Sequence, residues 1–415
     1  MFLRVALSLA VLSACADEAA PKPQPASSTE VAAAASLLVP STVAMPMSSI
    51  RTTSPTIELN ALDSQISSAE KNFAKAATLD ARMQLVGTLL VRFKVTAKLA
   101  DFSRAIELAA IPLSEKPSVD ELLVVAQGLA ASHKFADALK LLDQAKALGD
   151  KTKAIAIDGR RYGVLFGLGR YEEALAIAET HARVQANASA LSDHAAVLAA
   201  MGSRDQAEAL FLQAENKYRG VSPFFVAQLY FDRGSMFEKT GDLTNATALY
   251  RAANKRLPQH VHVATHLAPL LAPSEGIALL EPLAQGGEDP DVFAQLGVLK
   301  NIAASKSGDA ELQKAKERYE TAMAKHPDAF ADHAGWFWLN VGEDAKKALD
   351  AAKRNLGNRQ TADAYELVLA AAEEAKDTTT LCAERPKAQA LKWKTLRLES
   401  RLANLKVDCS ATTPK

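Results

Sequence analysis

The sequence predicts an all-α solenoid of about eight helical hairpins, and three observations lead to this fold class. Pairs of short amphipathic segments joined by a turn recur along the chain at intervals of 30 to 39 residues. Each pair carries a small residue at the equivalent place in its second segment. No run of alternating apolar and polar residues is long enough to predict a β-sheet. Because repeats of this length stack on their neighbours, we expect one elongated body.

The repeat is clearest in residues 234–258, where Gly241 and Asp242 mark a turn between two helices. Residues spaced three and four apart lie on one face of a helix. This spacing occurs before the turn at Tyr230, Gly234 and Phe237, and after it at Leu243, Ala246, Tyr250 and Ala253. Pro258 follows and cannot continue the second helix. The stretch therefore predicts a helical hairpin.

Small residues equivalent to Ala246 predict where the other hairpins cross. They are Ala105, Ala138, Ala174, Ala207, Ala246, Gly276, Ala315 and Ala348. The long interval between Ala207 and Ala246 leaves room for a linker. After this linker, Ser222 is placed to cap a helix and Pro223 to occupy its first position. The short interval between Ala246 and Gly276 predicts a repeat that is shorter than the others.

The order of small and large residues in residues 234–258 resembles the tetratricopeptide repeat, whose period is 34 residues. The resemblance implies that the first helices of the hairpins line a concave groove, which receives a peptide or a partner helix. The groove positions carried over from the family are Leu90, Lys94, Leu123, Gln127, Phe166, Phe231 and Ser235. Trp336 is added because consecutive aromatic residues on a helix cannot all face inward. Alternatively, the small residues in these helices only allow tight packing.

Residues 1–14 have the pattern of a signal peptide, with one cation, Arg4, before a short apolar run. The run is too short to span a bilayer. Leu12, Ser13 and Ala14 precede Cys15 as in a bacterial lipobox, which implies that the Cys15 thiol receives lipid. An ordinary secretory signal cleaved near residue 16 is the alternative.

The residue after Cys15 is Ala16, and by the same resemblance the outer membrane is favoured over inner-membrane retention. Residues 15–56 are rich in Ala, Pro, Ser and Thr and predict a disordered tether, with a short helix over residues 31–39 as the alternative. The predicted solenoid covers residues 57–380.

Residues 381–415 are expected to form a C-terminal cap and tail. Residues 386–405 have a helical pattern that can fold back on the array. Cys382 and Cys409 form an even pair if Cys15 carries lipid, which permits one disulfide in an oxidising compartment. Two free thiols are the alternative.

Composition and motifs argue against nucleic-acid binding and against catalysis. The chain has 48 basic and 48 acidic residues, so no basic surface is indicated. It has no phosphate-binding loop, nucleophile elbow or zinc-protease helix. We expect neither an enzyme nor a cofactor. His260, His262 and His266 are a weak candidate metal site, because residues four apart on a helix can share one ion, and surface histidines are the alternative.

These observations together predict a lipid-anchored scaffold or assembly factor of the bacterial cell envelope, favouring the outer membrane, whose partners are envelope proteins or peptides. The alternative is a periplasmic protein that binds a small ligand or metal through the three histidines.

Overall fold

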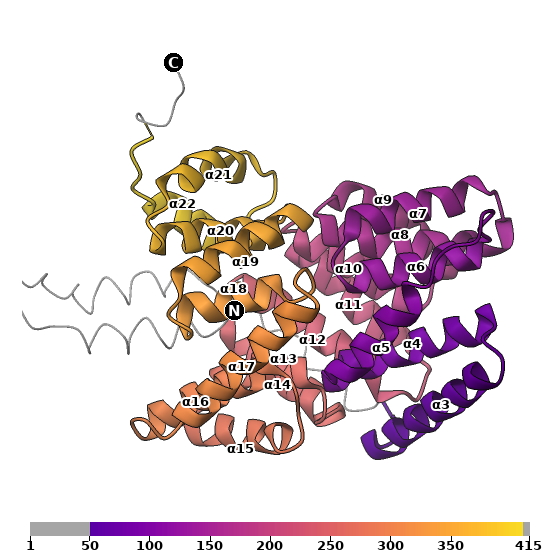
Figure 1. The fold of residues 1–415 in the computed structure, drawn as a ribbon, viewed down its shortest axis with the longest axis horizontal. Coiled ribbons are helices and arrows are strands. Elements are labelled where there is room, and N and C mark those ends of the chain that lie inside the picture. The colour runs from indigo at the N-terminus through magenta and orange to yellow at the C-terminus, as the bar shows by residue number, and fades with distance from the viewer. Residues whose placement is uncertain (1–49, 410–415) are drawn as a thin grey trace, which may run out of the picture.

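The computed structural model describes residues 50–409, which are almost entirely helical and contain no strand (Figure 1). The hairpins, given as first and second helix, are α4 (Leu79–Thr96) with α5 (Leu99–Ala109), α6 (Val119–Ala131) with α7 (Phe135–Ala147), α8 (Ala154–Leu168) with α9 (Tyr171–Gln185), α10 (Ala188–Ala200) with α11 (Arg204–Lys217), α12 (Pro223–Lys239) with α13 (Leu243–Arg256), α14 (Val261–Leu267) with α15 (Pro273–Ala284), α16 (Pro290–Ala303) with α17 (Asp309–Lys325), α18 (Ala331–Asn340) with α19 (Ala345–Asn358), and α20 (Ala362–Glu374) with α21 (Thr378–Ala390). Helix α3 (Pro55–Lys75) precedes the array and α22 (Leu396–Asn404) follows it. The predicted all-α solenoid is confirmed.

Every small residue predicted to mark a hairpin crossing is buried on the second helix of its pair. The seven alanines at these positions have no exposed surface, and Gly276 is buried as well. A larger side chain there would separate the two helices, because protein interiors are close-packed. The crossings therefore set the distance between the helices of each hairpin.

The hairpin of α12 and α13 shows how local sequence fixes the geometry. Ser222 accepts a hydrogen bond from the amide of Phe224, and Pro223 occupies the first turn, as predicted. Gly241 forms the turn with φ of 81°, a conformation that favours glycine. At Gly234, a Cβ atom would lie 2.8 Å from Cε1 of Tyr250, so only glycine allows this approach.

Two predicted boundaries are wrong. The tether was expected to extend to residue 56, but the Thr53 amide donates to the Val221 carbonyl at 2.7 Å, and Arg256 donates to the Ile50 carbonyl at 2.6 Å. Residues 50–54 therefore belong to the folded body. Cys15, the signal peptide and most of the predicted tether lie outside the described residues.

At the other end, the boundary expected at residue 380 falls inside α21. This hairpin was not predicted, because Leu381 stands where the other repeats have alanine or glycine. Pro386 lies within α21, so the single helix expected over residues 386–405 is the end of α21, a short connection and α22.

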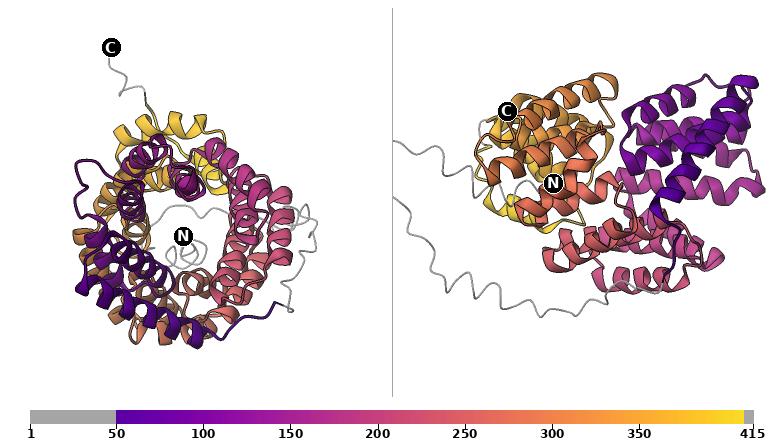
Figure 2. Two further views of the ribbon diagram at one scale, coloured as in Figure 1. Left: turned by 90° about the vertical axis from the view of Figure 1, so that its right-hand side faces the viewer. Right: turned by 90° about the horizontal axis from the view of Figure 1, so that it is seen from below.

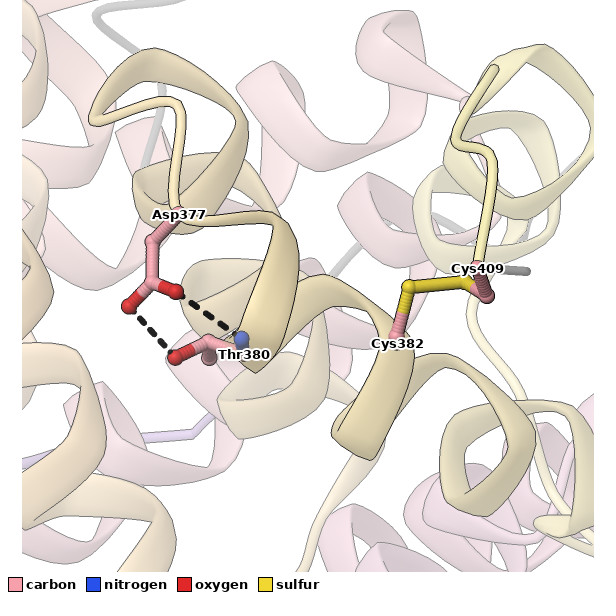
Figure 3. Close-up of a disulfide and its surroundings, with 4 residues drawn as sticks. All are labelled: Asp377, Thr380, Cys382 and Cys409. Atoms are coloured by element: carbon pink, nitrogen blue, oxygen red, sulfur yellow. Dashed lines mark hydrogen bonds between the residues drawn. A yellow bond between two sulfur atoms is a disulfide. The ribbon is translucent and has the colours of Figure 1, made fainter. Parts of the chain in front are cut away.

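The C-terminal cap is joined to the last hairpin by a disulfide between Cys382 and Cys409 (Figure 3). Asp377 begins α21 by accepting hydrogen bonds from the backbone amide and hydroxyl of Thr380 at 3.0 and 2.7 Å. Trp393, between α21 and α22, contacts Tyr171 of α9, with ring centroids 5.8 Å apart. The cap thus links the end of the array to its earlier part.

The solenoid curves until its early and late hairpins meet, which gives a ring of helices (Figure 2, left). We call this meeting line the closing seam. Ser103 of α5 shares a hydrogen bond of 2.8 Å with His326 after α17, and the Leu99 amide donates to the carboxylate of Glu288 at 2.8 Å. Residues more than 180 positions apart in sequence are thus in direct contact. Among residues 50–409, no helix has both the length and the hydropathy that a membrane span needs.

Replacing Ala246 by leucine should lower the free energy of unfolding by about 1 to 3 kcal/mol, because the added atoms overpack a crossing that has no free volume. Chemical denaturation followed by circular dichroism measures this. The same substitution at Ala136, which is exposed on α7, is the matched control and should have little effect. Equal stability of the two variants would contradict the crossing geometry.

Candidate functional site

Two adjoining cavities lie on the inner face of the ring. The first cavity, of about 390 Å³, is lined by residues of α4, α12, α14 and α16 and of the α17–α18 connection, and so lies along the closing seam. The second cavity, of about 350 Å³, is lined mainly by α12, α14, α16 and α18. Phe231, His262 and His333 line both. Volumes of this size are typical of small ligand sites.

The residues lining the second cavity follow from helical spacing. Successive first helices present residues three and four apart to the inside of the ring. These are Phe231, Ser235 and Lys239 on α12, His262 and His266 on α14, Asp291 and Gln295 on α16, and Asp332, Trp336 and Asn340 on α18. The closing seam adds Phe166 and Tyr171 from the third hairpin.

Charged side chains around the second cavity are paired with one another. Lys239 lies 2.9 Å from Asp363, Arg359 lies 3.4 Å from Asp332, and Nδ1 of His266 lies 2.9 Å from Glu238. Lys239 and Arg359 thus each have a carboxylate close by. The walls of the second cavity consequently consist of aromatic groups, neutral polar groups and charged groups that already have a partner.

His333 and Asp291 form the ion pair at the boundary between the two cavities. Nδ1 of His333 lies 2.6 Å from Asp291, which also accepts a hydrogen bond from the hydroxyl of Tyr319. Burial disfavours the imidazolium, but Asp332 and Asp291 outweigh this effect and raise the pKa of His333 to about 9. His333 therefore carries a positive charge at neutral pH.

The three histidines considered as a metal site do not converge. His260 is 3% exposed, and its ring stacks on Phe231. Burial lowers its pKa to about 4. The His262 and His266 rings lie edge to face, 4.8 Å apart, and His266 pairs with Glu238. Within residues 50–409, no three side chains of His, Cys, Asp or Glu are arranged to hold a metal ion.

Five of the predicted groove residues line the cavities. Phe231 lines both, Lys94 lines the first, and Phe166, Ser235 and Trp336 line the second. They come from four hairpins that the curvature of the array brings together.

The other three predicted groove residues do not line either cavity. Leu123 is 2% exposed and packs in the core of the second and third hairpins, and Leu90 packs against the core of the first. Gln127 is half-buried and lies outside both linings. Assigning Leu123 to the groove was wrong because its side chain is enclosed by neighbouring hairpins.

Gln295, Asn355 and Arg359 are among the polar residues of the second cavity that were not predicted from the sequence. Gln295 could have been found, because it follows Asp291 by one helical turn on a first helix. Asn355 and Arg359 lie at the end of a second helix, α19, where the resemblance gives no groove position. Only the packing of α19 on its neighbours places them at the cavity.

Stacked hairpins with a buried small residue at each crossing decide the architecture. The chain has the fold of tetratricopeptide-repeat proteins. No protein-family model matches the sequence, and no curated protein matches it.

Similar solved structures include three repeat proteins. The APC/C hetero-tetramer Cut9-Hcn1 has 16% identity and a TM-score of 0.45, and the match covers 82% of this chain and 66% of that one. A Rap protein complexed with competence and sporulation factor has 11% identity and a TM-score of 0.46, and the match covers 80% of this chain and 98% of that one. The C-terminal part of a TPR repeat-containing protein from Cytophaga hutchinsonii has 16% identity and a TM-score of 0.33, and the match covers 58% of this chain and 96% of that one.

The raised pKa of His333 predicts that this tetratricopeptide-like solenoid loses stability in alkali. The ion pair of His333 and Asp291 makes its full contribution to stability at pH values below about 6.5, the pKa of histidine in the unfolded chain. This contribution is lost as the pH rises through about 9, the pKa of His333 in the folded protein. Because the His333 side chain is 40% exposed, we expect a contribution of about 1 kcal/mol. Thermal unfolding of wild type and His333→Gln at pH 6 and pH 10 measures it. The difference between the two proteins should shrink at pH 10, and a constant difference would contradict the charged pair.

Proposed function

We propose that this protein is a non-catalytic scaffold, anchored by lipid to a bacterial envelope membrane, which binds a segment of a partner polypeptide inside its ring. The observation that carries the proposal is the pair of adjoining cavities, both lined by aromatic side chains, of which the second also has cations already paired with carboxylates. Apolar lining with a few polar groups is the usual character of a binding site.

The aromatic residues supply most of the expected affinity. Phe231 lines both cavities, and Phe166 and Trp336 line the second from hairpins far apart in the array. Large aromatic side chains bury much apolar surface at interfaces and commonly dominate binding energy. Two adjoining cavities suit a chain segment that places successive apolar side chains in each.

The lipid anchor is proposed from the sequence. Leu12, Ser13 and Ala14 before Cys15 resemble a lipobox, and Ala16 favours the outer membrane. A single acyl chain binds membranes only marginally, whereas several chains on one residue hold a protein firmly. An anchored ring would present its cavities to other envelope proteins, which fits a role as assembly factor or docking scaffold.

Peptide binding tests the cavity directly. A fluorescent pool of N-acetylated, C-amidated hexapeptides of Ala, Val, Leu, Phe, Gly and Ser should bind the detergent-solubilised full chain, with affinity measured by anisotropy. Replacing Trp336 by alanine should weaken binding at least about tenfold, because an aromatic anchor is lost. Val184→Ala, on the exposed surface of α9, is the control and should bind as wild type does. Failure of the wild type to bind the pool would refute the proposed peptide-binding function.

The anchor is tested by replacing Cys15 with serine, which removes the thiol that would receive lipid. The variant should appear in the soluble fraction after cell lysis, whereas the wild type should sediment with membranes. Labelled palmitate should be incorporated into the wild type alone. A variant that still sediments with membranes would contradict the lipid anchor.

A further inference from the structure

A buried amide oxygen, a buried guanidinium nitrogen and a partly accessible side-chain amide face the second cavity, and none of them has a hydrogen-bond partner in the part of the chain that the structure describes. Gln295 is 8% exposed, and its Oε1 atom accepts no hydrogen bond. Asn355 is 3% exposed as a residue and lines the same cavity, where its side-chain amide keeps some accessible surface and makes no hydrogen bond within residues 50–409. Nε of Arg359, one turn after Asn355, is also buried without an acceptor.

Unpaired polar groups of this kind are costly. Removing an amide from water without giving it a new partner destabilises the fold. Folded proteins consequently leave few of them, and each one calls for a reason. Gln295 lies on α16, Asn355 lies in the last turn of α19 and Arg359 directly follows that helix, and all three line one cavity. A ligand that supplied their hydrogen bonds would remove the cost.

We propose that Gln295 and Asn355 hold the main chain of an uncharged, extended, internal segment of the partner polypeptide. A primary amide has both a donor and an acceptor, which match the alternating N–H and C=O groups of an extended chain. Gln295 Oε1 accepts from a main-chain N–H, Asn355 meets the adjacent peptide group, and Arg359 Nε donates to a carbonyl. This assignment rests on the proposed function and specifies the ligand of the same site.

The charges around the cavity argue against a chain terminus. Lys239 is already paired with Asp363, and Arg359 with Asp332, so neither is a free cation for a terminal carboxylate. Nδ1 of His266 lies 2.9 Å from the carboxylate of Glu238. A charged group entering the cavity would have to displace one of these partners. An uncharged segment whose apolar side chains contact Phe166 and Trp336 avoids that competition.

Peptides with an altered main chain provide the first test. The hexapeptide pool described above is compared with an N-methylated pool of the same sequences, which lacks the main-chain donors but keeps every side chain. We expect the N-methylated pool to bind at least about tenfold more weakly. A third pool with free carboxylates should bind no better than the amidated one. Equal binding of the N-methylated pool, or tighter binding of the free carboxylates, would overturn the assignment.

Amide removal provides the second test, since it separates a binding role from a structural one. Gln295→Met and Asn355→Leu keep much of the side-chain volume and remove the unpaired polar groups. Both should weaken binding of the amidated pool about tenfold, yet melt at the same temperature as the wild type or higher, because Gln295→Met removes a buried unpaired oxygen and Asn355→Leu removes an amide that makes no hydrogen bond in the fold. Gln127→Met, at a glutamine outside both cavities, is the control and should bind normally.

The two tests also distinguish this inference from the proposed function. If the pool binds the wild type and Trp336→Ala weakens it, but Gln295→Met does not, the cavity binds peptides without main-chain recognition and the inference is wrong. A variant that loses binding and also melts at a lower temperature shows a structural role, which overturns it too. If no pool binds the wild type, both the inference and the proposed function fail.

Discussion

The close crossing of two helices at one small residue is the constraint on which the whole structure depends. At each crossing the alanine or glycine is enclosed, so the two helices of a hairpin approach one another closely. Because each hairpin packs chiefly on its neighbours, small rotations between hairpins accumulate into curvature. Here they accumulate until the array meets itself at the closing seam, so the inner face becomes the wall of a ring (Figure 2).

Closure changes what the inner face can do. An open solenoid exposes the side chains of its groove to water, where an ion pair contributes little. At the closing seam, α4 and α6 lie across from α14, α16 and the start of α18, and the first cavity is enclosed between them. The cap joined by Cys382 and Cys409 reaches α9 through Trp393 and adds a second link between the ends of the array. Polar groups in this interior interact more strongly than they would in an open groove.

The sequence predicted the hairpins well because each one is a local pattern. Ala246, Gly241 and Pro223 are each explained by residues within one turn of their own position. The last hairpin was missed because Leu381 replaces the small residue that marks the other crossings. The cavities were predicted only in part: Phe231 lies on a first helix at a groove position that the resemblance gives, and Trp336 was predicted from its run of consecutive aromatic residues. The distant helices that face these residues are determined by the curvature accumulated over many repeats. Residue spacing within one repeat does not predict that curvature.

Asn355 illustrates the same limit and also shows why the interior is polar. Nothing near it in sequence distinguishes it from an exposed residue at the end of an amphipathic helix. Packing of α19 makes it one of the most buried polar residues of the cavity wall. If the interior served stability alone, an apolar side chain would serve better at this position and at Gln295, because replacing a buried unpaired amide by a similar apolar group is neutral or stabilising. Proteins keep such groups where binding needs them, at the expense of stability. The pairing of Lys239 with Asp363 and of Arg359 with Asp332, combined with amides left unpaired, is the pattern expected of a site that recognises a neutral polar ligand.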